Sequence, residues 1–282
     1  GGVPFLGMQT ANPLDPLIFL EMILPTGLAL GLSYAVLFFV AGLGTLVYLW
    51  DRGIKSHGAL ALSATAFAIN PYFLPWLGDR PLVSGLPPLP LALFAMERTM
   101  VLERPRKNSA LLASCIAFSA LTGTLQILTL FILVLLVRLV WILGQRHRRG
   151  SRKETRGITW IGVAAMAGLS LAFLPLGAGM EVVHQSARLS GTEGYYAANN
   201  FLHWGALGLW LNPGAFGFPA EGDMSVAEQF QRRFMSGSGW GFSGVIPLGL
   251  ALFALVRAAG PARERVFWAC LGGITAIFLF LQ

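Results

Sequence analysis

The side chains of this sequence that could do chemistry are carboxylates, amides, aromatic rings and an arginine, and they gather in a few polar stretches. Glu181, His184 and Arg188 are spaced so that they share one face of a helix and could point together toward a charged headgroup. The alternative for these three residues is a solvated continuation of the preceding helix. Because acids, amides, rings and a cation occur together, the mixture suits a carbohydrate or a phosphate ligand.

A second group combines flat rings with amides. Tyr196, Asn199, His203 and Trp204 would form a sugar platform, in which rings stack on the sugar and polar groups bind its hydroxyls. The alternative is that these aromatic residues anchor the chain at a membrane interface. Further polar candidates for binding a substrate lie elsewhere, at Gln9, Asn12 and Asp79, and Asp15 lies beside the first two, just before the first span.

The elements that must position these residues are membrane helices. Hydrophobic residues make up 55% of the 282 residues and charged residues only 12%, about half the roughly 25% of a soluble domain. The sequence has no P-loop, zinc-protease or serine-hydrolase motif. Cys115 and Cys270 each lie in an apolar run, so neither a disulfide framework nor metal-ligand spacing is present. This composition excludes a soluble cytosolic enzyme.

The apolar runs predict an all-α, polytopic transmembrane bundle of about eight segments, because a spanning helix needs roughly 20 apolar residues. Clear spans are expected at residues 26–50, 58–77 and 158–179. The run 109–144 is too long for one span, so we divide it at the polar Thr122-Gly123-Thr124. Residues 83–96, a short piece broken by prolines, and segments at 241–256 and 266–281 complete the eight. Outside this count, an interfacial or re-entrant piece is expected around residues 17–20.

The basic residues give this bundle two different sides. The loops 51–57, 97–107, 145–157 and 257–265, together with Arg138, hold 16 Lys or Arg and 5 acids, whereas the rest of the chain holds 4 and 8. The positive-inside rule then predicts cytoplasmic basic loops, with residues 1–25 and a long loop at 181–240 on the outer side. Arg138 is expected to extend its side chain toward the basic side instead of forming a buried functional charge. The net charge of +7 therefore reflects membrane flanks and does not indicate a nucleic-acid partner.

Several short motifs follow one another in a distinctive order. They are Gly2-Val3-Pro4-Phe5-Leu6 with Gln9, Asn12-Pro13 and Pro16-Leu17; Ala41-Gly42-Leu43-Gly44 with Tyr48-Leu49; 64–73 and 90–98, ending in Met96-Glu97-Arg98; Ala120-Leu121-Thr122-Gly123 with Gln126; Pro175, Glu181 and Ser186-Ala187-Arg188; Leu211-Asn212-Pro213 with Phe216-Gly217; and 241–247. This order, which covers nearly the whole chain, resembles that of YfhO-type bacterial integral membrane proteins of the GT-C class of glycosyltransferases.

The resemblance implies a single GT-C-like domain over residues 1–282, in the bacterial cytoplasmic membrane. It implies transfer of a sugar from a polyprenyl-phosphate donor to an extracytoplasmic acceptor of the cell envelope, usually with inversion. Such transfer needs a carboxylate to deprotonate the acceptor hydroxyl, and an Arg or a divalent cation such as Mg or Mn at the departing phosphate. Arg188 matches the pattern best and is expected to contact that phosphate.

The catalytic acid of the class lies in the first outer loop, near the helix before it, which here would fall before Gly1. The sequence starts without Met and stops inside an apolar run, so we expect a fragment that lacks the N-terminal part of the protein. Asp15 is the candidate acid within the chain, although the family pattern more often has an aromatic or small polar residue at that position.

Two other functions remain open. The Pro- and Gly-interrupted segments 58–96 and 109–144 are also typical of a transporter or a lipid flippase, whose sites are framed by broken helices. Transporters concentrate ionisable groups near the membrane midplane, however, and the spans here hold few polar residues beyond Asn70, Gln126 and Arg138. The second of these is a non-enzymatic membrane protein that retains the same architecture.

Overall fold

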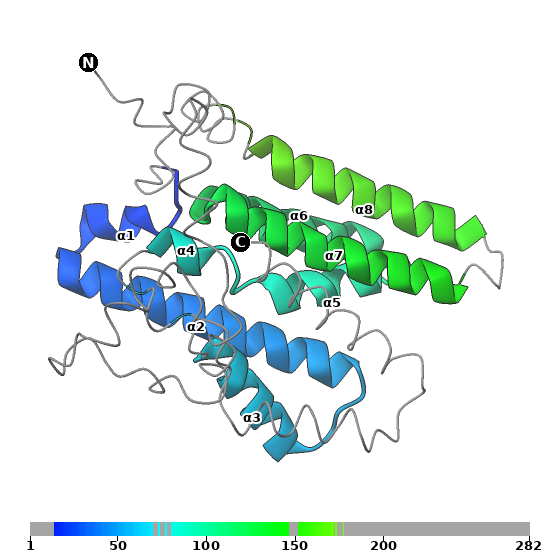
Figure 1. The fold of residues 1–282 in the computed structure, drawn as a ribbon, viewed down its shortest axis with the longest axis horizontal. Helices are drawn as coiled ribbons and strands as arrows, with labels where there is room; N and C mark the ends of the chain where they lie inside the picture. The colour runs from blue at the N-terminus through cyan, green and yellow to red at the C-terminus, as the bar shows by residue number, and fades with distance from the viewer. Residues whose placement is uncertain are drawn as a thin grey trace, which may run out of the picture. The chain divides into compact units, whose positions relative to one another are not determined.

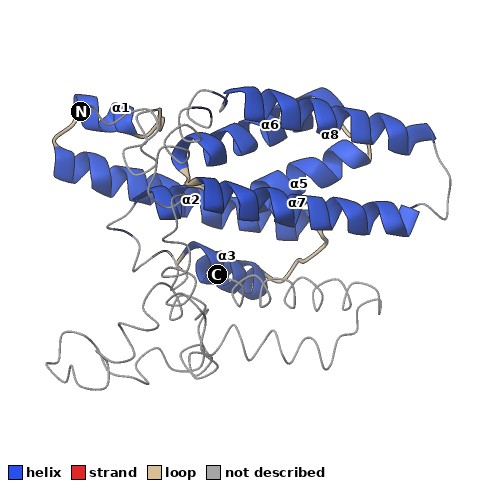
Figure 2. Ribbon diagram, turned by 45° about the horizontal axis from the view of Figure 1, so that its top comes forward, coloured by secondary structure: helices blue, strands red, loops and turns tan. Residues whose placement is uncertain are grey.

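The computed structural model describes residues 14–69, 73, 77, 80–146, 152–171, 173 and 177. The chain divides into two compact units, the first of residues 1–69 and 76–184, the second of residues 70–75 and 185–282. All the helices described below belong to the first unit, and every regular element among the described residues is a helix (Figure 2). The all-α prediction is therefore confirmed for this part of the chain.

Eight helices follow one another along the described part of the chain (Figure 1). Their bounds are α1 Ile18–Ile23, α2 Thr26–Asp51, α3 His57–Ala68, α4 Arg80–Ser84, α5 Leu89–Met100, α6 Pro105–Thr122, α7 Leu125–Arg146 and α8 Arg152–Leu171. Two stretches, all of α2 and Leu125–Gln145 of α7, are long and apolar enough to cross a membrane by length and composition. The piece expected around residues 17–20 is the short helix α1.

The predicted break in the long apolar run is confirmed. Helix α6 ends at Thr122, and the backbone of Gly123 is extended, with φ −92° and ψ 166°. Helix α7 begins two residues later, where the Thr124 hydroxyl accepts the N–H of Ile127 at 3.4 Å. Threonine side chains at this position satisfy a donor that the first turn of a helix leaves without a partner. The polar tripeptide therefore ends one helix and starts the next.

The short, broken character of residues 83–96 is also confirmed. Helix α4 ends at Ser84 and α5 begins at Leu89, so Pro87 and Pro88 lie between them. Proline has no N–H to donate within a helix, and its ring restricts the residue before it. Pro90 is tolerated in the first turn of α5, since the N–H groups there have no partner in the helix.

Two of the expected spans differ from the structure. Helix α3 ends at Ala68, so its 12 residues are about 18 Å long, well short of a bilayer core of roughly 30 Å. The prediction of one helix over 58–77 is wrong in length; Asn70 precedes Pro71 in the sequence, a position that disfavours helical backbone. Helix α8 begins at Arg152 and so takes up part of the expected basic loop. The expected segments 241–256 and 266–281 and the loop 181–240 lie outside the described residues.

Helix α5 is the centre of the first unit. It packs against α2, α6, α7 and α8, and buried side chains lie around most of its circumference, among them Ala92, Ala95 and Met96. These join a core that includes Tyr48 of α2, Ile116 of α6 and Phe131 of α7. Close approach to α2 is possible because Gly44 has no side chain, since a Cβ there would lie 3.2 Å from the Leu91 backbone nitrogen.

The helix ends divide between two ends of this unit (Figure 1). At one end lie the C-termini of α2, α5 and α7 and the N-termini of α3, α6 and α8, which we call the basic end. The other end holds α1, α4 and the start of α2, and we call it the opposite end. The basic end carries the connections that are rich in Lys and Arg.

Candidate functional site

Asp15 is the one residue of the sequence-predicted site that the structure describes. The other candidates lie outside the described residues: Gln9, Asn12, Asp79, Glu181, His184, Arg188, Tyr196, Asn199, His203 and Trp204. The site is therefore built here from Asp15 and the described residues around it.

Asp15 lies at the opposite end, directly before α1, and only 1% of its surface is exposed. Its Oδ1 atom accepts the backbone N–H of Leu17 at 2.8 Å, and its carbonyl accepts the N–H of Ile18 at 3.0 Å. Both bonds satisfy N–H groups at the start of α1, in the way that Asp commonly does at turns and helix starts. The backbone therefore fixes one oxygen of the carboxylate and the direction of the side chain.

The second oxygen faces an arginine from another part of the chain. Arg80, the first residue of α4, places its Nε atom 3.1 Å from Asp15 Oδ2. The contact is one of charge, because Oδ2 is buried and has no well-aligned hydrogen-bond partner among the described residues. The guanidinium group of Arg80 also pairs with Glu21 of α1. Arg80 thus lies between two carboxylates and leaves one buried oxygen of Asp15 able to accept a further hydrogen bond.

Helix α4 is held firmly enough to position Arg80. The carbonyl of Pro81 accepts the N–H of Thr124 at 3.2 Å, which ties α4 to the break between α6 and α7. Gly85 and Gly123 touch there, and a Cβ on Gly85 would lie 3.2 Å from the Gly123 Cα atom and 2.6 Å from Ile127. On the other side, the Tyr34 hydroxyl of α2 donates to the carbonyl of Leu77, just before α4.

Burial raises the pKa of the Asp15 carboxyl above its ordinary value of 3.8, and the Leu17 N–H and the Arg80 charge offset this only in part. A carboxylate with a raised pKa is a stronger proton acceptor, which suits a general base. The cluster does not suit a divalent cation, because Arg80 occupies both carboxylates and the described residues hold no group of three or more metal-ligating side chains. Nor does a guanidinium between two carboxylates suit a phosphate.

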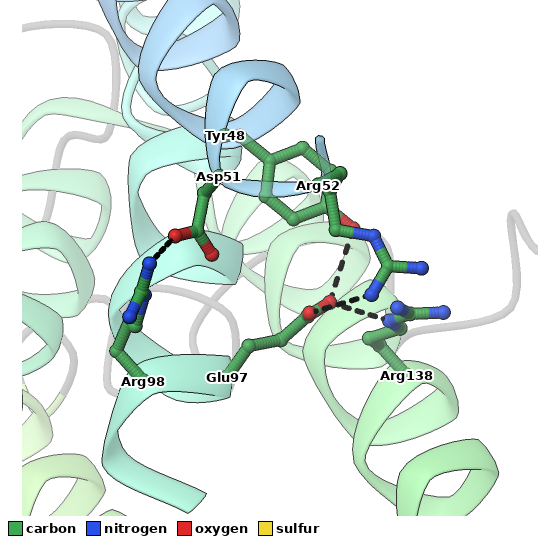
Figure 3. Close-up of polar contacts among 6 residues, drawn as sticks. All are labelled: Tyr48, Asp51, Arg52, Glu97, Arg98 and Arg138. Carbon is green, nitrogen blue, oxygen red and sulfur yellow. Dashed lines mark hydrogen bonds and ion pairs between the residues drawn. The ribbon is translucent and has the colours of Figure 1, made fainter. Parts of the chain in front are cut away.

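A second polar cluster, at the basic end, was not predicted as a site (Figure 3). Glu97 of α5 accepts hydrogen bonds from Arg138 Nε of α7 at 2.7 Å and from the Tyr48 hydroxyl of α2 at 3.1 Å, both on Oε1. Its Oε2 atom accepts Arg52 Nη1 at 3.1 Å. One carboxylate therefore joins three helices, and we call this group the Glu97 cluster.

The prediction for Arg138 is wrong. Its side chain is directed to the basic side, but it is 2% exposed and is paired with Glu97 instead of reaching water. The expected basic loop 97–107 begins too early, since α5 continues to Met100 and presents Glu97 to α7. The signal for this pairing was the Met96-Glu97-Arg98 motif, which places an acid at the end of an apolar helix.

A neighbouring set of charges extends the cluster. Arg98 pairs with Asp51 at the end of α2 and with Glu103 beyond α5. Figure 3 shows Arg98 and Glu97 directed to different sides of α5, so that adjacent residues bind two separate parts of the end of α2. The arrangement fixes the positions of α2, α5 and α7 relative to one another and has the character of a structural clamp.

The comparisons with known proteins give no further assignment. No protein-family model, no curated protein and no solved structure matches this chain.

Proposed function

We propose that the protein is a membrane glycosyltransferase that moves a sugar from a polyprenyl-phosphate donor to an acceptor of the bacterial cell envelope. The observation that carries the proposal is the Oδ2 atom of Asp15, which is buried, has no hydrogen-bond partner among the described residues and lies at the end away from the basic loops. Arg80 pairs with this oxygen by charge at 3.1 Å without a well-aligned hydrogen bond, so its capacity to accept one is unused, and one explanation is a substrate hydroxyl that bonds to it.

In this reaction Asp15 is the general base. Its Oδ2 atom takes the proton from the acceptor hydroxyl while that oxygen attacks the anomeric carbon of the donor sugar. The bond between this carbon and the phosphate oxygen breaks, and its electron pair leaves with the polyprenyl phosphate. The raised pKa of Asp15 makes it a better proton acceptor than an exposed aspartate. Attack from the side opposite the phosphate inverts the sugar.

Arg80 and Arg188 have different roles in the proposal. Arg80 contacts the Oδ2 atom of the base itself, 3.1 Å away, but is assigned no contact with the sugar or the phosphate, so in the proposal it is a positioning residue that directs the carboxylate. Arg188 is the residue proposed to stabilise the departing phosphate. Burial of Asp15 keeps water away from the base, which favours transfer over hydrolysis.

The described charges favour transfer over transport. Sites of secondary transporters lie near the membrane midplane, whereas Asp15 precedes α1 and Glu97 lies in the last turn of α5, where Arg138, two helical turns from the end of α7, pairs with it. Residues 26–50 of α2 contain no Asp, Glu, Lys or Arg, and Arg138, which is paired with Glu97, is the one such residue in 125–145 of α7. A flippase or transporter is therefore the less favoured function.

The test uses the full-length protein in native membranes, supplied with polyprenyl-phosphate hexoses that carry radiolabelled sugar. Asp15→Asn keeps the size of the side chain and the oxygen that accepts the Leu17 N–H, and it removes the base. We expect sugar transfer to fall by about 10²-fold or more, while the amount of folded protein stays the same. Glu21→Gln is the matched control, because Glu21 contacts Arg80 but not Asp15 Oδ2.

The outcomes separate the parts of the proposal. Full activity of Asp15→Asn would show that another acid is the base, and loss of activity in Glu21→Gln to the same extent would reduce Asp15 to a structural role. Absence of transfer from every donor by the unmodified protein would overturn the glycosyltransferase itself. Arg188→Ala is expected to weaken binding of polyprenyl phosphate, and unchanged binding and transfer would refute the role of Arg188.

A further inference from the structure

Helix α2 has two different faces. Its buried face carries Ala29, Ser33, Leu37, Ala41, Gly44, Thr45 and Tyr48, and packs in the first unit. Its exposed face carries large apolar side chains: Leu28, Leu32, Val36, Phe39, Leu43, Leu46 and Trp50, each 36% to 67% exposed. At 100° per residue, these seven positions lie within an arc of about 80°. The result is one continuous apolar stripe, which we call the α2 stripe, along the whole helix.

The α2 stripe ends at the basic end in an aromatic ring with a cation on it. Trp50 is 50% exposed, and the Lys55 ammonium lies 4.2 Å from the centre of its ring. The turn between them is a Schellman motif: Ile54 N–H bonds to the Leu49 carbonyl at 3.1 Å, and Gly53 N–H to that of Trp50 at 3.0 Å. Gly53 permits it with a φ of +88°, a conformation that favours glycine.

We propose that the α2 stripe, Trp50 and Lys55 form a binding site for one anionic phospholipid of the leaflet at the basic end. The acyl chains lie along Phe39, Leu43 and Leu46. The Trp50 ring lies at the depth of the glycerol and headgroup, where indole rings concentrate, and the Lys55 ammonium contacts the headgroup phosphate. This inference depends on placement in a membrane and not on glycosyl transfer.

The charges around Lys55 favour an anionic headgroup over a zwitterionic one. The nearest acid in the sequence, Asp51, is paired with Arg98, and Glu97 is paired with Arg52 and Arg138. Residues 52–57 contain two cations and no acid. The phosphate of an anionic headgroup could therefore pair with Lys55 without competition from these carboxylates. Lys55 lies at the end of the apolar α2 stripe, which suits the acyl chains of the same lipid.

Neither an inorganic phosphate nor a second copy of the chain would match both the α2 stripe and Lys55. An inorganic phosphate would use Lys55 but not the α2 stripe, and a second copy of the chain would use the stripe but bring its own basic end to Lys55 if it packed in parallel. A lipid with an anionic head and long chains fits both. The apolar length and the cation at its end therefore point to the same ligand.

The experiment measures lipid binding to the purified full chain in a neutral detergent, by native mass spectrometry during titration. The probes are dioleoyl-phosphatidylglycerol, dioleoyl-phosphatidylcholine, dihexanoyl-phosphatidylglycerol and inorganic phosphate. We expect the first to bind most tightly, with the short-chain lipid and inorganic phosphate at least about tenfold weaker, because they cannot cover the α2 stripe.

Lys55→Gln should weaken the binding of dioleoyl-phosphatidylglycerol about fivefold, which corresponds to about 1 kcal/mol for one surface cation. The affinity for phosphatidylcholine should not change. Lys107→Gln is the matched control, since Lys107 is an exposed cation at the start of α6, and its effect should be less than about twofold. In Gly53→Ala the added methyl group meets no neighbouring atom, but the positive φ of this residue disfavours alanine. This variant should weaken the binding of the anionic lipid although Lys55 is still present.

Four outcomes would overturn the proposal. One is equal affinity for phosphatidylglycerol and phosphatidylcholine, and another is an equal loss in Lys55→Gln and Lys107→Gln, which would indicate a diffuse charge effect. The third is a Leu43→Cys chain, with Cys115 and Cys270 replaced, that forms a disulfide-linked dimer in lipid, since a second copy would then occupy the α2 stripe. Binding of inorganic phosphate as tight as that of the long-chain lipid would identify an anion site only.

Discussion

Arg138 on α7 and Glu97 on α5 form a buried ion pair, with 2.7 Å between Nε and Oε1 and side chains that are 3% and 13% exposed. Taking both charges out of water is costly, and the pair is stable only because its hydrogen bonds and mutual attraction offset that cost. The Tyr48 hydroxyl and Arg52 add further hydrogen bonds to the same carboxylate. The relationship makes Glu97 the residue on which the packing of three helices depends.

Glu97→Gln should therefore destabilise the protein strongly. It removes the charge that compensates Arg138 in a buried site, and breaking such a pair typically costs about 3–5 kcal/mol. The measurement is thermal denaturation in detergent. Glu103→Gln is the control, because Glu103 pairs with Arg98 but is 53% exposed, and a surface pair contributes about 1 kcal/mol or less.

Replacement of both partners separates the lost pair from the uncompensated charge. Glu97→Gln combined with Arg138→Gln should be more stable than Glu97→Gln alone, since no unpaired charge is left. If the double variant is less stable than the single one, or if Glu97→Gln and Glu103→Gln cost the same, the buried pair does not hold these helices together.

Local signals in the sequence predicted part of this fold correctly. The apolar run of α2, the threonine-glycine break after α6 and the prolines between α4 and α5 each act on the backbone within a few residues. Their effects could be predicted without knowledge of the fold. The length of α3 was not predicted correctly, because the apolar run in the sequence continues past Ala68 whereas the helix ends there.

Contacts between helices were beyond the sequence. The pair of Arg138 and Glu97 depends on how α5 and α7 are rotated toward each other, and that of Asp15 and Arg80 on the close contact of Gly85 with Gly123. The sequence identified Asp15 as a candidate catalytic acid, but the residues near it in the sequence do not indicate that Arg80 faces it. Burial and partners of a charge are set by packing, which a single sequence does not contain.

The stability of the protein should fall as the pH rises above the ordinary pKa of Asp15. Burial raises the pKa of this carboxyl in the folded chain above 3.8, so the folded chain binds the proton more tightly than the unfolded chain. Its contribution is fully present below 3.8 and is lost as the pH rises through the folded pKa. Asp15→Asn has no such proton, so the stability of the unmodified protein relative to Asp15→Asn should decrease over this range.

Thermal denaturation of both chains at a series of pH values measures this difference. A difference that is constant with pH would mean that the pKa of Asp15 is the same in the folded and unfolded chains. A difference that increases with pH would mean that Arg80 outweighs burial and lowers the pKa, in which case Asp15 would be a weaker base than proposed.

Gly168 should be essential to the contact between α6 and α8. A Cβ at this position would lie 2.8 Å from both the Ala113 carbonyl oxygen and the Ile116 Cβ atom, with backbone on one side. Gly168→Ala should cost about 1–3 kcal/mol, as overpacking typically does. Gly162→Ala is the control on the same helix, since nothing lies within 4 Å of its added Cβ, and it should stabilise α8 by about 0.5–1 kcal/mol. Equal effects on the melting temperature would show that α6 and α8 do not pack closely.

The proposed chemistry also requires that the basic end face the cytoplasm, because lipid-linked sugars are transferred on the outer side. A single cysteine at Arg149, in a connection rich in basic residues, should resist a membrane-impermeant maleimide in intact cells, and one at Ala198 should react. Cys115 and Cys270 are replaced first. The cysteine at position 149 should become reactive when the cells are opened, which would show that it is accessible and is shielded only by the membrane in intact cells. The reverse pattern would place residues 181–240 in the cytoplasm, and the proposed donor and acceptor would then be on the wrong side of the bilayer.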